Sequence, residues 1–319
     1  ASHRFPSFIA KAGICDIRYI HRYFQTHQGI WQLGLTSPGG AGRNKTLNQS
    51  DFLDIQILLP PFKEQERIAD IIDTWDEAIA LTNALIKALQ QRKKGLMQKL
   101  LTGEIRFPGF DDAWEEVRID DVARVNPPKP KNLDENTVVS FVGMADVSED
   151  ARLTTKESRP YSEVSSGFTP FRDMDILIAK ITPCLENGKG ALVNGLDNGL
   201  GFGSTEFHVV RAKAEKTFPE FLYYHTVSHN FRGRGELNMV GSAGQKRVPT
   251  DYVRAYRFPI PTLAEQKKII ASLSDADDGI NLYKLYVTEL QQQKKGLMQQ
   301  LLTGQVQVKG MDYVRVLHK

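Results

Sequence analysis

Two stretches of the chain place apolar residues at alternating steps of four and three, the 3.5-residue period of helices that pair side by side. Each helix is expected to begin just after a proline-rich segment, LLPPF or IPIPTL, because proline is tolerated only in the first turn. Each is expected to end at the glycine of LLTG, a favoured C-terminal cap. The predicted seam residues are Ile68, Ile72, Trp75, Ile79, Ile86, Leu89, Leu96, Leu100, Ile269, Leu273, Ile280, Val287, Leu290, Leu297 and Leu301.

The two stretches belong to an internal repeat. Residues 93–103 read KKGLMQKLLTG and residues 294–304 read KKGLMQQLLTG, an offset of 201. The same offset aligns Asp76 with Asp277, and with a one-residue slip Ala10-Lys11-Ala12 falls on Ala212-Lys213-Ala214. The sequence therefore reads as about one and a half copies of a 200-residue unit. It begins in the middle of the first copy, so residue 1 is not expected to be a natural domain start.

The length of the segment between the helices favours antiparallel pairing. About 40 helical residues make a rod of roughly 60 Å at a rise of 1.5 Å per residue. The connector of about 155 residues is enough for one domain of ordinary size. A parallel pair would need this connector to run the whole length of the rod, whereas an antiparallel pair would not. Antiparallel pairing also gives the pseudo-twofold symmetry natural to two copies of one unit. In the alternative, each helix merely packs on its own globular domain.

These patterns divide the chain into five parts. Residues 1–59 are the end of a first globular domain, 60–106 the first spacer helix, 107–259 a complete second domain, 260–304 the second spacer helix, and 305–319 a tail. Inside the second domain, VVSFVGMADV, DILIAKI, ALVNGL, STEFHVVRA and VRAYRFPI have the composition of strands, and FPEFLYYHTVSHNF that of one helix. The predicted fold class is α+β: loop-rich mixed α/β domains joined by an antiparallel coiled-coil spacer with a pseudo-twofold repeat.

Composition excludes several classes of protein without identifying one. Hydrophobic residues make up 41% and charged residues 25% of the 319 residues, which is ordinary globular usage. No apolar run approaches the roughly 18 residues of a membrane helix, and the two cysteines form no CxxC motif. We therefore expect a soluble protein of the reducing cytoplasm that contacts no membrane.

Charge is distributed unevenly in the second domain. Acidic residues dominate residues 111–150, whereas bases outnumber acids in residues 152–257, and many of these bases lie in or beside glycine-rich loops. Such a face suits contact with a phosphate backbone, because Lys and Arg replace counterions there. A solvated charged face would explain the same pattern, and the formal net charge of +3 does not by itself indicate nucleic acid.

No segment has the pattern of an active site. The NPPK segment at Asn126 resembles the NPP[YF] loop of adenine methyltransferases but has Lys129 where an aromatic residue should stack on a base, so a proline turn is the better interpretation. GLGFG at 199–203 is followed by a strand pattern and is interpreted as a tight loop. His225 and His229 have helical spacing but no further metal ligand nearby, and no metal site is predicted.

The repeat itself resembles a known family, the DNA-specificity subunits of type I restriction–modification systems. The resemblance rests on LLPPFKEQERIADIID with KKGLMQKLLTG, and on FPIPTLAEQKKIIASL with KKGLMQQLLTG. In the second domain, residues 175–193 and 201–210 also fit the family's recognition domains. Most of the first recognition domain would be missing from this chain.

The resemblance implies a non-catalytic subunit that reads a bipartite double-stranded DNA target through two target recognition domains held apart by the spacer. It implies docking of modification subunits, which bring S-adenosylmethionine, and of restriction subunits, which use ATP and Mg; no cofactor is expected in this chain. The residues proposed to contact DNA are Arg43, Asn44, Lys45, Lys180, Lys189, Ser204, Arg232, Arg234, Gln245, Lys246 and Arg247.

Two other hypotheses remain open from the sequence. A protein-only coiled-coil scaffold would explain the helices but leave the basic, glycine-rich domains without a use. A stand-alone DNA methyltransferase or nuclease would need a cofactor or metal site that the sequence does not display.

Overall fold

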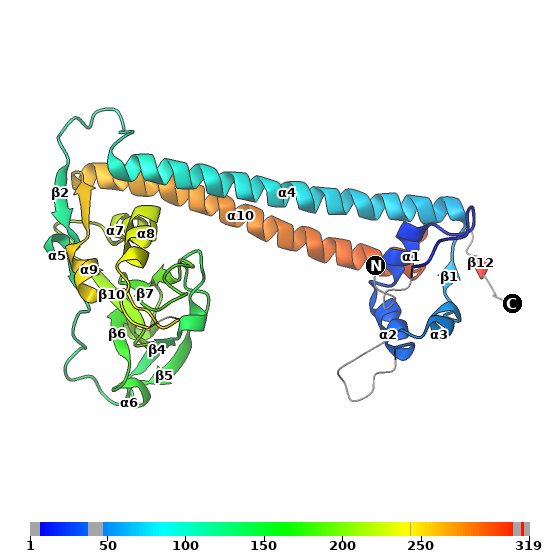
Figure 1. Ribbon diagram of the computed structural model, residues 1–319, viewed down its shortest axis with the longest axis horizontal. Helices are drawn as coiled ribbons and strands as arrows, with labels where there is room; N and C mark the ends of the chain where they lie inside the picture. Colours follow the sequence, from blue (N-terminus) through cyan, green and yellow to red (C-terminus); the bar gives the residue numbers. More distant parts are fainter. Residues whose placement is uncertain (1–6, 38–46, 243, 309–313, 316–319) are drawn as a thin grey trace. The chain divides into compact units, whose positions relative to one another are not determined.

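The computed structural model describes residues 7–37, 47–242, 244–308 and 314–315. The chain divides into two compact units, residues 1–90 with 279–319 and residues 91–278. The two longest helices, α4 (Phe62–Thr102) and α10 (Leu263–Leu302), each contribute to both units (Figure 1). None of the described helices is long and apolar enough to cross a membrane.

Both long helices begin and end where the sequence predicts. The carbonyl of Pro61 accepts the backbone N–H groups of Glu64 and Gln65 and so opens the first turn of α4. Gly103 directly follows α4, and Gly304 follows α10 after Thr303. Both glycines have φ of +73°, a left-handed conformation that glycine adopts without a steric penalty. The LLTG motif therefore stops both helices in the same way.

Within each unit, α4 and α10 run antiparallel. In the first unit, Ile86 of α4 packs with Ile280 and Val287 of α10. Lys294 pairs there with Asp76. In the second unit, Lys93 Nζ lies 2.7 Å from a carboxylate oxygen of Asp277. Residues late on one helix meet residues early on the other, so the predicted antiparallel pairing of the two helices is confirmed within each unit.

A repeated glutamine fastens the start of each long helix to an earlier segment of the same unit. Gln65 Oε1 accepts the backbone N–H of Asp16 at 2.8 Å, and its Nε2 donates to the carbonyl of Pro60. Gln266, the equivalent residue of α10, accepts the N–H of Phe218 at 3.1 Å and donates to the carbonyl of Pro261. Both glutamines are fully buried. The repeat in sequence is therefore a repeat in contacts.

The first unit adds short elements around the helices. They are α1 (Ile17–Tyr23), α2 (His27–Leu35), α3 (Gln49–Leu53) and β1 (Leu58–Leu59), which pairs antiparallel with β12 (Val314–Arg315). Its core joins Tyr19 and Tyr23 of α1 to Ile68 and Ile72 of α4 and to Leu301 of α10.

The second unit contains two four-stranded sheets. The first has the order β3 (Ala123–Val125), β10 (Phe207–Ala212), β7 (Ile176–Ala179) and β8 (Gly190–Leu192), all antiparallel. The second has the order β5 (Glu157–Pro160), β4 (Val138–Val142), β9 (Leu200–Gly203) and β6 (Thr169–Arg172), with β4 and β9 parallel. A further pair joins β2 (Glu115–Arg118) to β11 (Arg257–Ile260).

Helices complete this unit. They are α5 (Ile119–Val122), α6 (Tyr161–Val164), α7 (Pro219–Val227), α8 (His229–Leu237) and α9 (Thr250–Ala255), with 3₁₀ turns at Met144–Asp146 and Asp197–Gly199. One apolar cluster fills the space between the sheets, for example Phe171 against Leu177. A second packs the other face of the first sheet on α7 and α8 and includes Leu100 of α4 and Ile269 of α10. The mixed α+β fold class is confirmed.

Three local predictions were wrong. The segment expected to be one helix is two, α7 and α8, because Ser228 has extended dihedrals (φ −66°, ψ 151°) and its side chain caps the N–H of Phe231. VRAYRFPI is the end of α9 followed by β11. GLGFG lies mostly in strand β9, where a Cβ at Gly201 would stand 2.0 Å from the ring of Phe171. Glycine is needed at that position for packing.

Candidate nucleic-acid interface

Three segments of the second unit bring several predicted DNA-contacting residues together. The backbone N–H of Lys180, just after β7, donates to the carbonyl of Glu206 at 2.8 Å, and Lys180 Nζ donates to the carbonyl of Thr205 at 2.7 Å. Arg247, from the loop after α8, reaches the Glu206 carboxylate from the other side. We call Lys180, Ser204, Gln245, Lys246 and Arg247 the basic loop cluster.

An ion pair organises this cluster. Arg247 Nη2 lies 2.8 Å from Oε1 of Glu206, and Arg247 Nε lies 3.0 Å from Oε2. The hydrogen bonds from Arg247 lower the pKa of the Glu206 carboxyl group. Burial, and more weakly the charge of Arg247, lowers the pKa of the Lys180 ammonium group. Lys246 is exposed and, within the described part of the chain, has no carboxylate partner.

The remaining predicted contacts are scattered. Lys189 Nζ donates to the carbonyl of Met144 at 2.8 Å. Arg234 lies on the exposed side of α8. Arg43, Asn44 and Lys45 lie outside the described residues.

The position of Arg232 does not fit the predicted DNA contact. Its side chain is inside the domain, with the residue 8% exposed. Nε donates to the carbonyl of Thr226 at 2.9 Å, and Nη1 to those of Leu185 and Lys189 at 3.3 and 3.2 Å. Burial lowers the pKa of the guanidinium group to about 10. Arg232 therefore holds the loop before β8 from within the domain and does not lie on the exposed surface with Arg234.

The two histidines of FPEFLYYHTVSHNF are separated by their environment. His225 is buried against the rings of Phe221 and Phe258, with centroid distances of 4.9 and 4.3 Å, and burial lowers the pKa of its imidazole to about 3. His229 is exposed at the start of α8. The described residues contain no group of three or more His, Cys, Asp and Glu side chains placed to hold a metal ion.

The predicted seam residues line the inner side of the long helices. Ten of them are buried: Ile68, Ile72, Ile86, Leu100, Ile269, Leu273, Ile280, Val287, Leu290 and Leu301. The other five are half-buried: Trp75, Ile79, Leu89, Leu96 and Leu297. Near their ends the helices pack into the cores of the two units.

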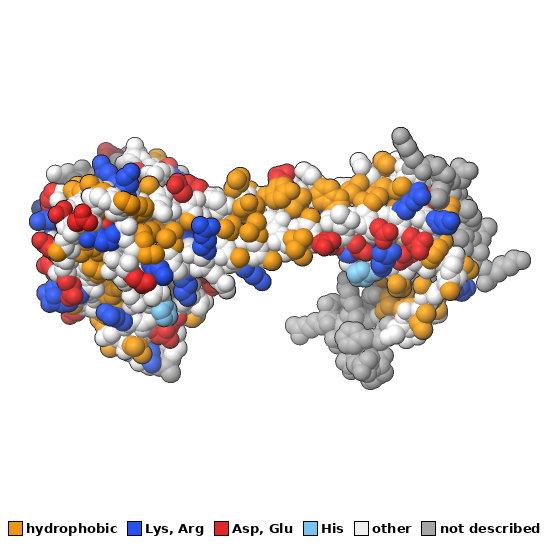
Figure 2. Space-filling view, turned by 90° about the horizontal axis from the view of Figure 1, so that it is seen from above, with side chains coloured by type: hydrophobic (Ala, Val, Ile, Leu, Met, Phe, Trp, Pro, Cys, Tyr) orange, Lys and Arg blue, Asp and Glu red, His pale blue; other side chains and the backbone are white. Residues whose placement is uncertain are grey.

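The periodicity argument missed a second apolar surface on the long helices. Leu81, Leu282 and Leu285 are each more than 60% exposed, and Leu85 and Tyr286 are also exposed. All five lie in the parts of α4 and α10 that belong to the first unit. Figure 2 shows apolar side chains exposed along the helical part of the molecule. We call these five residues the spacer patch; the offset of 201 pairs Leu81 with Leu282 and could have revealed part of it.

Sequence reasoning also missed the role of a repeated aspartate. Asp277 of α10 accepts hydrogen bonds from Lys93 of α4 at 2.7 Å, from Arg152 at 2.8 Å and from the hydroxyl of Tyr224 at 3.2 Å. Asp76 of α4 is its repeat equivalent. It pairs with Lys294 of α10 and with Arg22 of α1. In each unit one aspartate therefore ties the two long helices to a helix of the attached domain.

Comparisons with known proteins identify the family of this chain. A family model described as the type I restriction modification DNA specificity domain matches residues 1–91 and 111–292. The type I restriction enzyme EcoEI specificity subunit of Escherichia coli is 30% identical over 269 residues, which are 80% of this chain and 44% of that protein. The EcoAI specificity subunit of the same organism is 40% identical over 187 residues, 58% of this chain and 31% of that protein. The chain thus spans less than half the length of these two relatives.

Solved structures share the fold. A chain from a type I R-M system matches with a TM-score of 0.55 at 18% identity, covering 90% of this chain and 71% of that one. The S subunit of a type I restriction–modification system from M. genitalium matches with a TM-score of 0.50 at 14% identity, covering 91% and 74%.

Proposed function

Because the chain belongs to the family of type I restriction–modification DNA specificity domains, we propose that it recognises DNA for a modification and restriction complex and does no chemistry itself. The second unit reads one part of a bipartite target, and the long helices join it to the recognition domain that reads the other part. S-adenosylmethionine would then be held by the modification subunit, and ATP and Mg by the restriction subunit.

The basic loop cluster is the observation that most supports DNA binding. One loop places Gln245, Lys246 and Arg247 on an exposed surface, and two segments distant in sequence bring Glu206 and Lys180 beside it. Lys246 can approach a phosphate, and the amide of Gln245 can make paired hydrogen bonds to adenine. Arg247 is held by Glu206, so it has to give up part of this ion pair before it contacts DNA.

The spacer patch supports docking of partner subunits. Monomeric proteins rarely leave several large apolar side chains together in water, and such surfaces usually mark an interface. Here Leu81, Leu282 and Leu285 are mostly exposed on two helices whose seam is already filled. We assign this surface to a modification subunit.

DNA binding with and without the modification subunit tests the proposal against its rivals. A specificity subunit binds DNA, and binds it more tightly or more selectively once the modification subunit is added. Methylation or cleavage by the chain alone would indicate an enzyme, and absence of DNA binding in both conditions would indicate a scaffold. Sequencing of the sites methylated by the assembled complex then identifies the target.

The spacer can be tested as a ruler. The sequence predicts that a heptad inserted in residues 80–89 changes the tolerated gap between half-sites. Because that segment pairs with α10, we expect the insertion to be tolerated only with a matching heptad in residues 281–290. Seven helical residues add about 10 Å, close to three base pairs at about 3.4 Å each. If the complex with the double insertion methylates sites with an unchanged gap between the half-sites, the spacer does not set that gap.

A further inference from the structure

The turn between β9 and β10 places an acid in the middle of the basic loop cluster. Glu206 follows Ser204, whose hydroxyl oxygen accepts the N–H of Glu206 at 3.1 Å, and the Glu206 side chain is 27% exposed. Arg247 grips the carboxylate with two nitrogens: Nε donates to Oε2 at 3.0 Å and Nη2 donates to Oε1 at 2.8 Å. An acid repels the phosphates that the surrounding cations attract, so its presence on this surface needs a reason.

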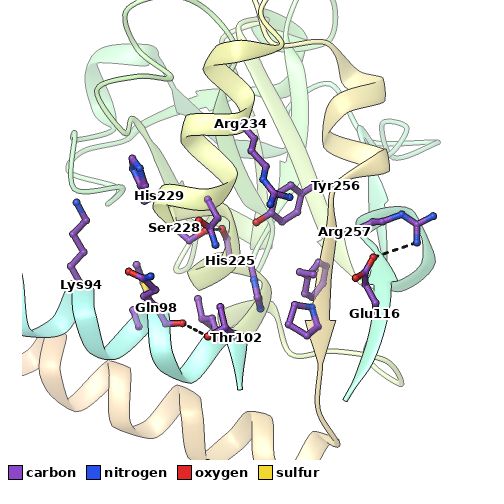
Figure 3. A pocket seen from close by; sticks show the side chains of 15 residues that line it. Lys94, Gln98, Thr102, Glu116, His225, Ser228, His229, Arg234, Tyr256 and Arg257 are labelled. Atoms are coloured by element: carbon purple, nitrogen blue, oxygen red, sulfur yellow. Dashed lines mark hydrogen bonds and ion pairs between the residues drawn. The ribbon is translucent and has the colours of Figure 1, made fainter. Parts of the chain in front are cut away.

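This ion pair is held more firmly than a second Arg–Glu pair of the same unit. Arg257 and Glu116, beside the cavity shown in Figure 3, approach each other only to 3.6 Å, and their side chains are 61% and 64% exposed. The backbone of Arg247, in contrast, exchanges two hydrogen bonds with Val240, at 2.8 and 3.0 Å. The acceptor and the donors of the gripped pair are therefore presented in a fixed arrangement before any ligand binds.

The internal repeat separates the residues that build these two loops from the residues at their tips. The builders are the same in both copies at an offset of 202: Ser204, Phe207, Gly241 and Gly244 match Ser2, Phe5, Gly39 and Gly42. This match is one of sequence, because residues 1–6 and 38–46 lie outside the described residues. In the second unit Ser204 closes the turn, Phe207 is fully buried and both glycines have positive φ, so each is needed for the fold.

The residues at the tips all differ between the copies. Glu206 corresponds to Arg4 and Arg247 to Lys45, so the first copy has two bases where the second has an acid and a base. The two residues before Arg247 also differ, since Gln245 and Lys246 correspond to Arg43 and Asn44. An ion pair that the loops required for folding would be repeated together with the residues that build them. Two domains that read different half-sites, however, have to differ where they contact bases.

The chemistry of the gripped pair matches one kind of base pair. In the major groove, C·G presents the N4 amino group of cytosine as a donor, next to O6 and N7 of guanine as acceptors. The hydrogen bonds from Arg247 lower the pKa of Glu206, so this side chain is a carboxylate that can only accept. Arg247 can only donate. A T·A pair would place the O4 acceptor of thymine against the carboxylate and the N6 donor of adenine against the guanidinium group.

We propose that Glu206 and Arg247 together read one C·G base pair in the half-site of the second unit. On this DNA, Arg247 gives up the hydrogen bond from Nη2 to Glu206 and donates from its two terminal nitrogens to O6 and N7 of guanine, while Nε stays on the carboxylate. The freed Oε1 accepts the N4 amino group of cytosine. The lost hydrogen bond is replaced only where the base pair is C·G. This inference rests on the proposed function and adds to it a base pair and the residues that read it.

The experiment uses the full chain assembled with the modification subunit of its own system. Sequencing of the methylated sites gives the wild-type target, and binding is then measured on duplexes in which each base pair of that target is replaced in turn, C·G by T·A and T·A by C·G. The variants are Glu206→Ala and Arg247→Ala, and Glu163→Ala, at an exposed position of α6, is the matched control. Circular dichroism verifies that all variants fold. One further duplex carries a cytosine without its N4 amino group at the responding position.

We expect wild type and the control to bind at least about tenfold more weakly when one particular C·G pair becomes T·A, whereas the same replacement weakens binding by Glu206→Ala and Arg247→Ala less than about threefold. Every other replacement should weaken binding by the variants as much as it weakens binding by wild type. Wild type should also bind the duplex without the N4 amino group more weakly, and Glu206→Ala should not distinguish it from normal DNA.

Two results would overturn the assignment and leave the proposed function intact. In the first, both variants weaken binding to all duplexes by the same factor, which would mean that the ion pair only holds the loops together. In the second, no C·G pair of the target responds to either variant. If the assembled wild type binds all duplexes equally, the proposed function fails as well.

Discussion

The repeated aspartate offers a quantitative test of how the long helices are fixed to the domains. In the second unit the Asp277 carboxylate accepts hydrogen bonds from Lys93, Arg152 and Tyr224. The side chains of Asp277 and Lys93 are each only 18% exposed. The perturbation is Asp277→Asn, which keeps the shape and one acceptor oxygen but removes the charge.

The magnitude follows from this partial burial. Breaking a fully buried ion pair by removing one partner costs about 3–5 kcal/mol, whereas an exposed pair contributes about 0–1 kcal/mol. Because the asparagine still accepts one hydrogen bond, we expect Asp277→Asn to lower the free energy of unfolding of the second unit by about 2 kcal/mol. In a double-mutant cycle with Lys93→Met, about 1 kcal/mol or more should appear as coupling between the two sites.

Hydrogen exchange in increasing urea, followed by mass spectrometry, measures the stability of each unit separately in the full chain. Asp278→Asn is the control, because Asp278 is the exposed neighbour on the same helix and forms no ion pair with a described residue. The reasoning is refuted if the coupling between positions 93 and 277 is below about 0.5 kcal/mol, or if Asp278→Asn destabilises the unit as much as Asp277→Asn.

Three further predictions concern the second unit. Lys246→Ala should lower the slope of the log binding constant against log salt concentration by about 0.9, and an unchanged slope would reject the phosphate contact of Lys246. Adding Arg247→Ala should weaken DNA binding further, because it leaves the Glu206 carboxylate without its partner. Arg232→Met should destabilise the unit by about 2–4 kcal/mol, since three carbonyls lose their donor, and urea unfolding should show this loss whereas Lys246→Ala shows none. The unit should also lose stability as pH falls from about 6.5 toward 3, by up to about 1.4 kcal/mol per pH unit from His225 alone. The folded-state pKa of His225, about 3, lies below its pKa in the unfolded chain, so the unfolded state takes up the proton first. Thermal melts of wild type and His225→Gln between pH 7 and 4 should therefore diverge in slope, and parallel curves would contradict the burial effect.

The features that sequence predicts well are those set by local signals. The 3.5-residue period, the prolines before α4 and α10 and the glycines after them fix both helices to within a few residues. The break between α7 and α8 is harder to see, because Ser228 interrupts an apolar pattern that would otherwise continue. Only the capping bond to Phe231 shows that the chain restarts there.

Arg232 shows why the candidate site was only partly predictable. In sequence it stands in a glycine-rich basic segment beside Arg234, and the two look alike. The fold separates them: Arg234 stays exposed, whereas Arg232 turns inward to carbonyls at Thr226, Leu185 and Lys189. Those carbonyls come from α7 and from the loop between β7 and β8. A charge pattern along one segment contains no information about acceptors that other segments supply.

The pairing of the aspartates, by contrast, could have been derived from the sequence. Lys93 interrupts the apolar seam of α4, and a cation in a helix seam needs an acid opposite. If antiparallel pairing places Lys93 opposite Asp277, then the pseudo-twofold axis must place its equivalent, Lys294, opposite Asp76. The structure shows both pairs. A repeat therefore does more than duplicate a fold. Each charged residue in the seam of one helix requires a residue of opposite charge at the facing position of the other helix. This requirement fixes the register of the two helices more firmly than the apolar period does, because a slip of one heptad would still satisfy the apolar period.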